Sequence, residues 1–372
     1  MDLFPDILKP ASMPTPISAV VDQVAPSFRF KPEAASTPSR FGLPPQRQNP
    51  WARVGCSFSP AAATDPALAI REAGLNWEVG RVDLRTADTL DPIPDVSAIR
   101  RSDTGKILGV VGPDFEPFQN AGMFQVFTDL AQVDRRDGGL RFTIETAGAF
   151  NGGKVVWALA HLPDLAIRIQ DDEAKTYLLV SNGHTGNKTL IIAPTTIRVI
   201  CRNTLAMAEA QAKANRRFGL AVGFTLKHTP GIHESVNQAK DTFAAVIRDH
   251  AATKAAWNRL AAVPLNKKRE ADLMRMVFGA PGPDESDRAR ALRKSREERI
   301  AAIIASPTSQ VKGTKDSLYS AMAAVCEWAD HDRTTRSSDG GNADEARLFS
   351  ATFGSGAELK ERAWSAALEL AA

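Results

Sequence analysis

Cysteine is scarce in this chain of 372 residues, and long apolar runs are missing. The three cysteines, Cys56, Cys201 and Cys326, lie far apart and form no CxxC pair, which excludes a disulfide framework and a cysteine-based zinc site. No stretch approaches the roughly 18 apolar residues that cross a bilayer. The first residues lack the basic and apolar regions of a secretory signal. We therefore expect a cytoplasmic protein with no membrane partner.

Recognisable catalytic motifs are also missing from the sequence. The chain has no GxxxxGK[ST] phosphate loop and no GxGxxG between a strand and a helix. It has neither the HExxH of zinc proteases nor the GxSxG of serine hydrolases. These absences predict no cofactor, no metal site and no catalytic residue, and they favour a protein that is not an enzyme.

Proline is abundant at the N-terminus, where residues 1–50 contain ten prolines. Proline removes a backbone donor and fixes φ, so regular helices and central strands are excluded there. We expect residues 1–50 to form an extended or disordered arm.

From about residue 51 to residue 229 the apolar pattern mostly has the period of two that is typical of strands. Three hairpins are indicated: 96–101 with 106–111, 141–150 with 154–161 around Asn151-Gly152-Gly153, and 166–170 with 176–181 around a turn at 171–175. Segments 119–133 and 204–215 have helical spacing. Because the alternation of a parallel sheet is missing, residues 51–229 predict an antiparallel α+β domain.

Beyond Pro230 the apolar period becomes helical. Apolar residues recur in steps of four and three from Ile232 to Leu260, which predicts a helix with a heptad seam. The seam needs an apolar partner, either the C-terminal helices or a second subunit, so a homo-oligomer through residues 232–260 is one outcome. More helices are expected at 268–278, 285–305, 316–331, 343–352 and 357–370.

The expected fold class is thus α+β, an antiparallel sheet with inserted helices followed by a helical C-terminal half. That half, residues 230–372, can pack on the sheet domain.

The cations are unevenly distributed, although the formal charge of +3 is near balance. Residues 198–275 hold fourteen Lys and Arg against six Asp and Glu, which favours a phosphate-binding surface. A solvated basic face, or pairing with the acidic N-terminal half, explains the same charges. The candidate nucleic-acid contacts in this part of the chain are Arg198, Arg202, Asn203, Lys213, Arg216, Arg217, Lys227 and His228.

Two other polar segments supply candidate contacts. Gln119 and Asn120 begin a predicted helix, where they can cap the helix or reach a base edge. His184 lies in the glycine-rich loop 181–187, whose donors and acceptors suit a phosphate or a base, and a plain connection between strands accounts for them equally. A metal-dependent nuclease would use His184 with Asp171 or Asp172.

An ordered series of motifs spans residues 75–370. It includes LGVV at 108–111, FQN at 118–120, GAFNGGKVVW at 148–157, SNGHTG at 181–186, IRVICRNTL at 197–205, KHT at 227–229 and AVCEWADH at 324–331. With this series the chain resembles the phage/plasmid-like family known as domain of unknown function 932. Gly183 and Trp328 stand where the family pattern favours an acidic residue and a tyrosine. The resemblance implies a mobile-element origin and supplies no established activity, so no catalytic residue is carried over.

These observations favour a phage- or plasmid-type protein that binds single-stranded nucleic acid or anneals strands, with single-stranded DNA as the partner. Lys and Arg would neutralise phosphates while the sheet or a groove holds bases unpaired. A non-enzymatic interaction factor of a mobile element, for example one acting against host defence, is the alternative. A metal-dependent nuclease is the third hypothesis.

Overall fold

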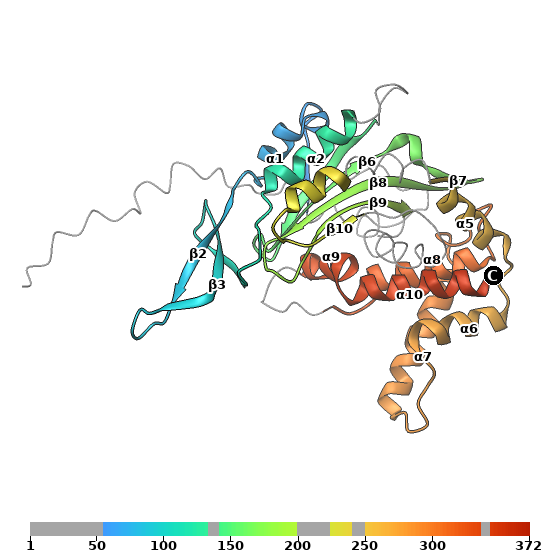
Figure 1. The fold of residues 1–372 in the computed structure, drawn as a ribbon. Coiled ribbons are helices and arrows are strands. Elements are labelled where there is room, and N and C mark those ends of the chain that lie inside the picture. Colours follow the sequence, from blue (N-terminus) through green and yellow to red (C-terminus); the bar gives the residue numbers. More distant parts are fainter. Residues whose placement is uncertain (1–54, 133–140, 199–223, 240–249, 336–342) are drawn as a thin grey trace, which may run out of the picture. The chain divides into compact units, whose positions relative to one another are not determined.

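The computed structural model describes residues 55–132, 141–198, 224–239, 250–335 and 343–372, and these belong to the unit Pro38–Ala372 (Figure 1). The strands are β1 Cys56–Ser57, β2 Val79–Arg85, β3 Pro92–Arg101, β4 Ile107–Val111, β5 Thr143–Phe150, β6 Val155–His161, β7 Ile167–Ile169, β8 Asp172–Gly183, β9 Leu190–Arg198 and β10 Phe224–Leu226. The helices are α1 Pro66–Glu72, α2 Asn120–Gln132, α5 His250–Ala262, α6 Lys267–Phe278, α7 Asp287–Ile304, α8 Leu318–His331, α9 Ala343–Phe353 and α10 Ser355–Leu370. The proline-rich arm and the helix expected at 204–215 lie outside the described residues, and the domain boundaries stay a prediction.

Seven strands form the central sheet in the order β1-β5-β6-β8-β9-β10, with β7 paired to β8. Neighbouring strands run antiparallel. The β5–β6 hairpin turns at Asn151, Gly152 and Gly153, whose φ angles of 52°, 68° and 105° lie in the left-handed region that favours Asn and Gly. The predicted α+β class, with an antiparallel sheet followed by a mostly helical half, is confirmed.

The central strands bury both of their faces. In β6, Val156 and Ala158 belong to the core that includes α2, whereas Trp157 and Leu159 belong to a second core that includes Leu348 of α9. Figure 1 accordingly shows α2 and α9 on opposite sides of the sheet. A strand buried on both faces reads as a continuous apolar run, as β6 does, because neither face needs polar residues.

A second sheet of three strands, in the order β2-β3-β4, lies beside the first. Ile99 of β3 and Leu108 and Val111 of β4 enter the same core as α2. Val82, Ala98 and Val110 lie directly opposite one another across the three strands, on the other face.

The start of β8 differs from the expected turn at residues 171–175. Asp172 already belongs to the strand, and the turn is confined to Gln170 and Asp171, with Gln170 at a φ of 52°. A distant loop fixes this start, because the Thr314 hydroxyl donates to the Asp172 carboxylate at 2.6 Å and the Asp171 N–H donates to the Lys312 carbonyl at 3.2 Å. Contacts across the chain therefore override the local preference of these polar residues for a turn.

The C-terminal helices share one core with the end of the β7–β8 hairpin. Its largest members are Trp257 of α5, Tyr319 of α8 and Trp364 of α10, each almost fully buried. Ile167 and Ala174 contribute from the hairpin. Among the described residues, no helix combines the length and the apolar composition needed to cross a bilayer.

The described parts of the predicted heptad seam have partners within the chain. Ile232 and Val236 are buried in the core of α2, whereas Trp257 and Leu260 are buried in the core of the C-terminal helices. Residues 240–249 lie outside the described part, so one continuous helix from Ile232 to Leu260 stays a prediction. The described seam residues offer no free apolar face to a second subunit.

An ion pair lies inside the helical core. The Lys360 ammonium of α10 contacts the Asp330 carboxylate of α8 at 2.9 Å, and both side chains are fully buried. Cys326, one turn before Asp330, is equally buried, and burial raises the pKa of its thiol to about 12. A thiol in this position stays protonated and serves as a packing group.

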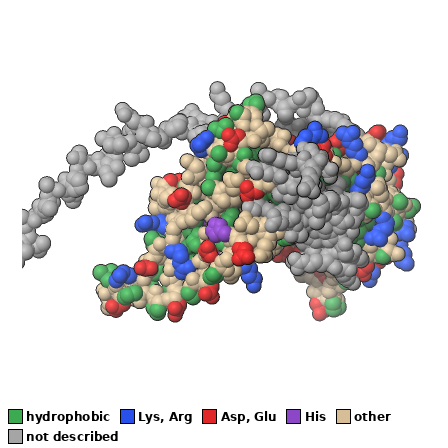
Figure 2. Space-filling view, turned by 45° about the horizontal axis from the view of Figure 1, so that its top comes forward, with side chains coloured by type: hydrophobic (Ala, Val, Ile, Leu, Met, Phe, Trp, Pro, Cys, Tyr) green, Lys and Arg blue, Asp and Glu red, His purple; other side chains and the backbone are tan. Residues whose placement is uncertain are grey.

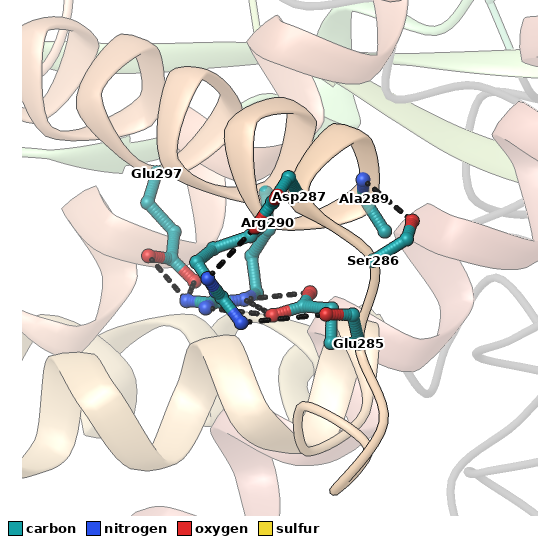
Figure 3. A network of polar contacts seen from close by, with 7 residues as sticks. Glu285, Ser286, Asp287, Ala289, Arg290 and Glu297 are labelled. Atoms are coloured by element: carbon teal, nitrogen blue, oxygen red, sulfur yellow. Dashed lines mark hydrogen bonds and ion pairs between the residues drawn. The ribbon is translucent and has the colours of Figure 1, made fainter.

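A polar network fixes the beginning of α7 (Figure 3). The Ser286 hydroxyl caps the helix by accepting from the Ala289 N–H at 3.3 Å. The Arg293 guanidinium donates to both carboxylate oxygens of Glu285, at 3.1 and 3.0 Å. The loop before α7 is thereby tied to the second turn of the helix.

Replacing Lys360 by Met should destabilise the fold by about 3–5 kcal/mol, because the Asp330 carboxylate then stays buried without its cation. The double variant Lys360→Met/Asp330→Leu should recover most of this loss. Urea denaturation measures both, with the exposed Lys312→Met as the control, for which we expect a change within about 0.5 kcal/mol. Equal losses in the single and double variants would contradict the role of the pair.

Candidate functional site

Three polar residues from distant segments meet beside the start of α2. The Asn120 amide donates to the carbonyls of Leu75 and Trp77 at 3.0 and 3.2 Å. Its oxygen lies 2.9 Å from Nε2 of His184. Because both amide hydrogens are used on carbonyls, the Asn120 oxygen accepts and His184 Nε2 carries the proton. Nδ1 of His184 is therefore the unprotonated nitrogen.

Two further amides tie the same segments together. Gln119 donates to the Val79 carbonyl at 2.9 Å and accepts from the Val79 N–H at 3.0 Å, so that its side chain imitates a neighbouring strand beside β2. Asn182, at the end of β8, donates to the Phe118 carbonyl at 2.6 Å. The amides of Gln119 and Asn120 thus hold backbone groups and do not cap α2.

The β5–β6 turn closes over this cluster. The Arg101 guanidinium lies 4.1 Å above the Trp77 ring and donates to the Gly152 carbonyl at 2.9 Å. The rings of Trp77 and His184 are arranged edge to face, with their centroids 5.5 Å apart. A side chain at Gly153 would come within 3.0 Å of Arg101 and Trp77, so that glycine is needed for this close approach.

His228 extends the cluster from the loop after β10. Its Nδ1 lies 3.2 Å from the Glu116 carbonyl, and its ring stacks on Phe115 at 4.9 Å. A carbonyl only accepts, so Nδ1 carries the proton and Nε2 is unprotonated. The backbone carbonyl thereby selects the tautomer of His228, as the Asn120 amide does for His184.

Both imidazoles are neutral at physiological pH. Burial, with the neighbouring His228 and Arg101 adding to it, lowers the pKa of His184 to about 3. Burial also lowers the pKa of His228. Each ring therefore presents a lone pair.

Three acceptor atoms of this cluster are buried without a hydrogen-bond partner: Nδ1 of His184, Nε2 of His228 and Oδ1 of Asn182. All three suit a donor such as an N–H or O–H group. No group of three or more His, Cys, Asp or Glu side chains placed to hold a metal occurs within the described ranges. Asn120, Asn182 and His184 are fully buried, so the contacts that these side chains make lie within the protein.

The pair of residues expected for a nuclease does not form one site. Asp172 begins β8 and His184 directly follows its end. At about 3.3 Å per residue, the strand holds these side chains tens of ångströms apart. Asp171 lies farther still along the same direction.

Exposed cations gather at the other end of the molecule, where α5, α6 and β7 lie (Figures 1 and 2). Within the described residues, six of them have neither a hydrogen bond nor an ion pair on the side chain. We call this set the basic end, and it consists of Lys254, Arg259, Lys267, Lys268, Lys312 and Lys315.

A short pairing of two segments assembles the basic end. Leu265 donates its N–H to the Asp316 carbonyl at 2.9 Å, and Leu318 donates to the Val263 carbonyl at 2.8 Å. Since this pairing is antiparallel, it brings Lys267 beside the loop that carries Lys315. Lysines that are far apart in the sequence therefore share one surface.

The structure separates the candidate residues into three groups. Gln119, Asn120, His184 and His228 form the cluster at α2, whereas Lys227 is exposed beside it. Arg198 ends β9, and its side chain is not described. Outside the described residues lie Arg202, Asn203, Lys213, Arg216 and Arg217.

None of the six residues of the basic end was among the sequence candidates. Four of them belong to the basic segment 198–275, whereas Lys312 and Lys315 lie in a linker after it. The close spacing of these two lysines in a loop with the single acid Asp316 was the available signal.

Replacing His184 by Gln should flatten the pH dependence of stability. In the unfolded chain His184 binds a proton below about pH 6.5, whereas in the folded chain it binds one only below about pH 3. The contribution of His184 to stability is therefore fully present above about pH 6.5 and falls as the pH drops from there toward about pH 3. The slope contributed is about 1.4 kcal/mol per pH unit. Denaturation curves between about pH 6 and about pH 4.5 measure the slope, since both limits lie inside the window.

His233→Gln, which removes an exposed imidazole, is the matched control for this measurement. An unchanged slope in the His184 variant would contradict the buried, neutral state of that ring.

Comparison with known proteins gives one family. Residues 107–352 match the family model described as Domain of unknown function (DUF932). No curated protein and no solved structure matches the chain. The matched range takes in β4 to α9, and thus the cluster at α2 and the basic end alike. Since it covers more than half of the sequence, the chain belongs to the DUF932 family.

Proposed function

We propose that the protein binds single-stranded nucleic acid through the basic end, as a binding or strand-annealing protein. The observation that carries this proposal is the convergence of six exposed cations from two separate segments, none of them neutralised within the described residues. Such a surface attracts the phosphate backbone, whose binding releases condensed counterions.

The kind of cation favours contact with the backbone over reading of bases. Five of the six side chains are lysines, which act as flexible point charges without the fixed fork that arginine offers to guanine. Contacts of this kind position a strand and carry no sequence information. A protein that pairs complementary strands of any sequence requires this tolerance.

The structure changes where we expect the bases of a bound strand to lie. The described central strands bury side chains on both faces, which favours a place for the bases away from the sheet. The strand would instead lie across α5, the beginning of α6 and the loop at 310–316, with its bases toward solvent. A cytoplasmic location and a phage or plasmid origin belong to the same proposal.

Binding to a single-stranded DNA oligonucleotide should weaken steeply with salt. Four neutralised phosphates give a slope of log K against log salt of about −3. The variant Lys268→Ala/Lys315→Ala should lower this slope by about 1.4, since each lost contact removes about 0.7. Fluorescence anisotropy over a series of KCl concentrations measures the slope, with a duplex of the same sequence as the comparison.

The matched control is Arg71→Ala/Arg100→Ala, which removes the same charge from two exposed positions on α1 and β3. We expect it to retain the wild-type slope. A slope near zero for the wild type, or equal effects of the two double variants, would overturn the proposal.

A further inference from the structure

Large apolar side chains are exposed at only two places in the described part of the chain. Four of them lie on or next to the three-stranded sheet, and the fifth lies on α7. Their exposed fractions are 65% for Leu90, 40% for Ile93, 46% for Ile107, 55% for Val110 and 65% for Leu292.

Two of the four, Val110 and Ile107, lie on the face of the sheet opposite to the core of α2, where Ala98 of the middle strand is fully buried. Val110 lies opposite Ala98, which lies opposite Val82, so the three share one face. Ile107 pairs with Arg100, two positions beyond Ala98, and continues the same face. The core of α2 takes only the residues of the other face.

The connection between β2 and β3 presents Leu90 in a fixed conformation. Leu90 has a φ of 59°, which is unusual for a leucine. Its N–H donates to the Thr86 carbonyl at 3.1 Å, and its own carbonyl accepts from the Arg85 guanidinium at 2.9 Å. These two hydrogen bonds hold the Leu90 backbone in a strained conformation, and in this conformation the apolar side chain is exposed.

The charges around the two apolar places are opposite. Residues 83–95 contain four aspartates, all exposed, against the single cation Arg85, a net charge of −3. Residues 285–299, which surround Leu292, contain six cations and four acids, a net charge of +2, and three of the cations, Arg290, Arg293 and Lys294, are paired with these acids. Arg288, one turn before Leu292, is exposed and has no partner among the described residues.

We propose that the apolar face of the three-stranded sheet, with its acidic tip, binds the Leu292 face of α7 in a second copy of the chain. Leu90 and Leu292 are both mostly exposed, so the two surfaces do not cover each other within one copy. Because the surfaces differ, the contact is head-to-tail, and each copy can engage two neighbours. Pairing of two identical sheets would instead bring two acidic tips together.

Two variants, each damaging one surface, test this assembly. Leu90→Asn/Ile93→Ser removes the apolar tip, with Asn chosen because it tolerates a positive φ, and Leu292→Glu places an acid on the basic helix. Sedimentation velocity on nuclease-treated protein should show wild-type mass rising with concentration. Each variant alone should remain a monomer, with self-association at least about tenfold weaker.

The equimolar mixture of the two variants gives the decisive result. One intact surface remains on each, so the mixture should form a heterodimer and nothing larger. Ala302→Glu adds the same charge to an exposed position elsewhere on α7 and should assemble like the wild type. Circular dichroism and thermal melting confirm that every variant is folded.

Three outcomes would overturn the proposal. They are a wild type that stays monomeric at all concentrations, a Leu292→Glu variant that still assembles, and a mixture of folded variants that stays monomeric. The measurement uses no DNA, so its failure leaves the binding proposal untouched, and loss of DNA binding leaves this one untouched.

Discussion

Burial of both faces of the central sheet is the constraint on which the rest of the structure depends. Strands such as β6 carry apolar side chains on both sides, and each side must be removed from water by a layer of helices. Among the described residues, α2 packs on one face, and Leu348 and Phe349 of α9 pack on the other. The buried side chains of these strands therefore serve the fold.

The polar cluster at α2 shows how such a fold accommodates side chains that prefer water. Burying an imidazole or an amide costs free energy unless hydrogen bonds replace those to water. Asn120 recovers this cost with three bonds, and it joins segments that lie more than forty residues apart in the sequence. These directional bonds fix which ring nitrogen of His184 is protonated, a selectivity that an apolar contact would not give. The motifs around Asn120 and His184 are consequently best explained as a support for the fold.

The sequence predicts those features of the fold that depend only on residues close together in the chain. The turn at Asn151, Gly152 and Gly153 needs left-handed backbone angles, and these residue types adopt them at low cost. The helices from residue 267 onward follow from apolar period and capping residues such as Ser286.

Features that depend on distant partners escape this reasoning. The Asp172 carboxylate accepts a hydrogen bond from Thr314 at the start of a strand, and no residue close to Asp172 in the sequence indicates that partner. His184 looks like a loop ligand in the sequence, and only its bond to Asn120 shows it as a buried support. Lys267 and Lys315 become neighbours through backbone pairing at Pro264 and Ser317, which no count of charge along the sequence detects.

The two proposed surfaces differ in what they would contribute to binding a long polymer. A basic end of six cations would contact few phosphates, so a single copy would bind weakly at physiological salt. Copies joined head-to-tail would repeat that basic end along a strand, and each bound copy would raise the effective concentration of the next. Affinity would then grow with the number of copies without any new contact to DNA. The exposed acidic connection between β2 and β3 fits this arrangement, because a nucleic-acid strand would repel it and α7 of the neighbouring copy would attract it.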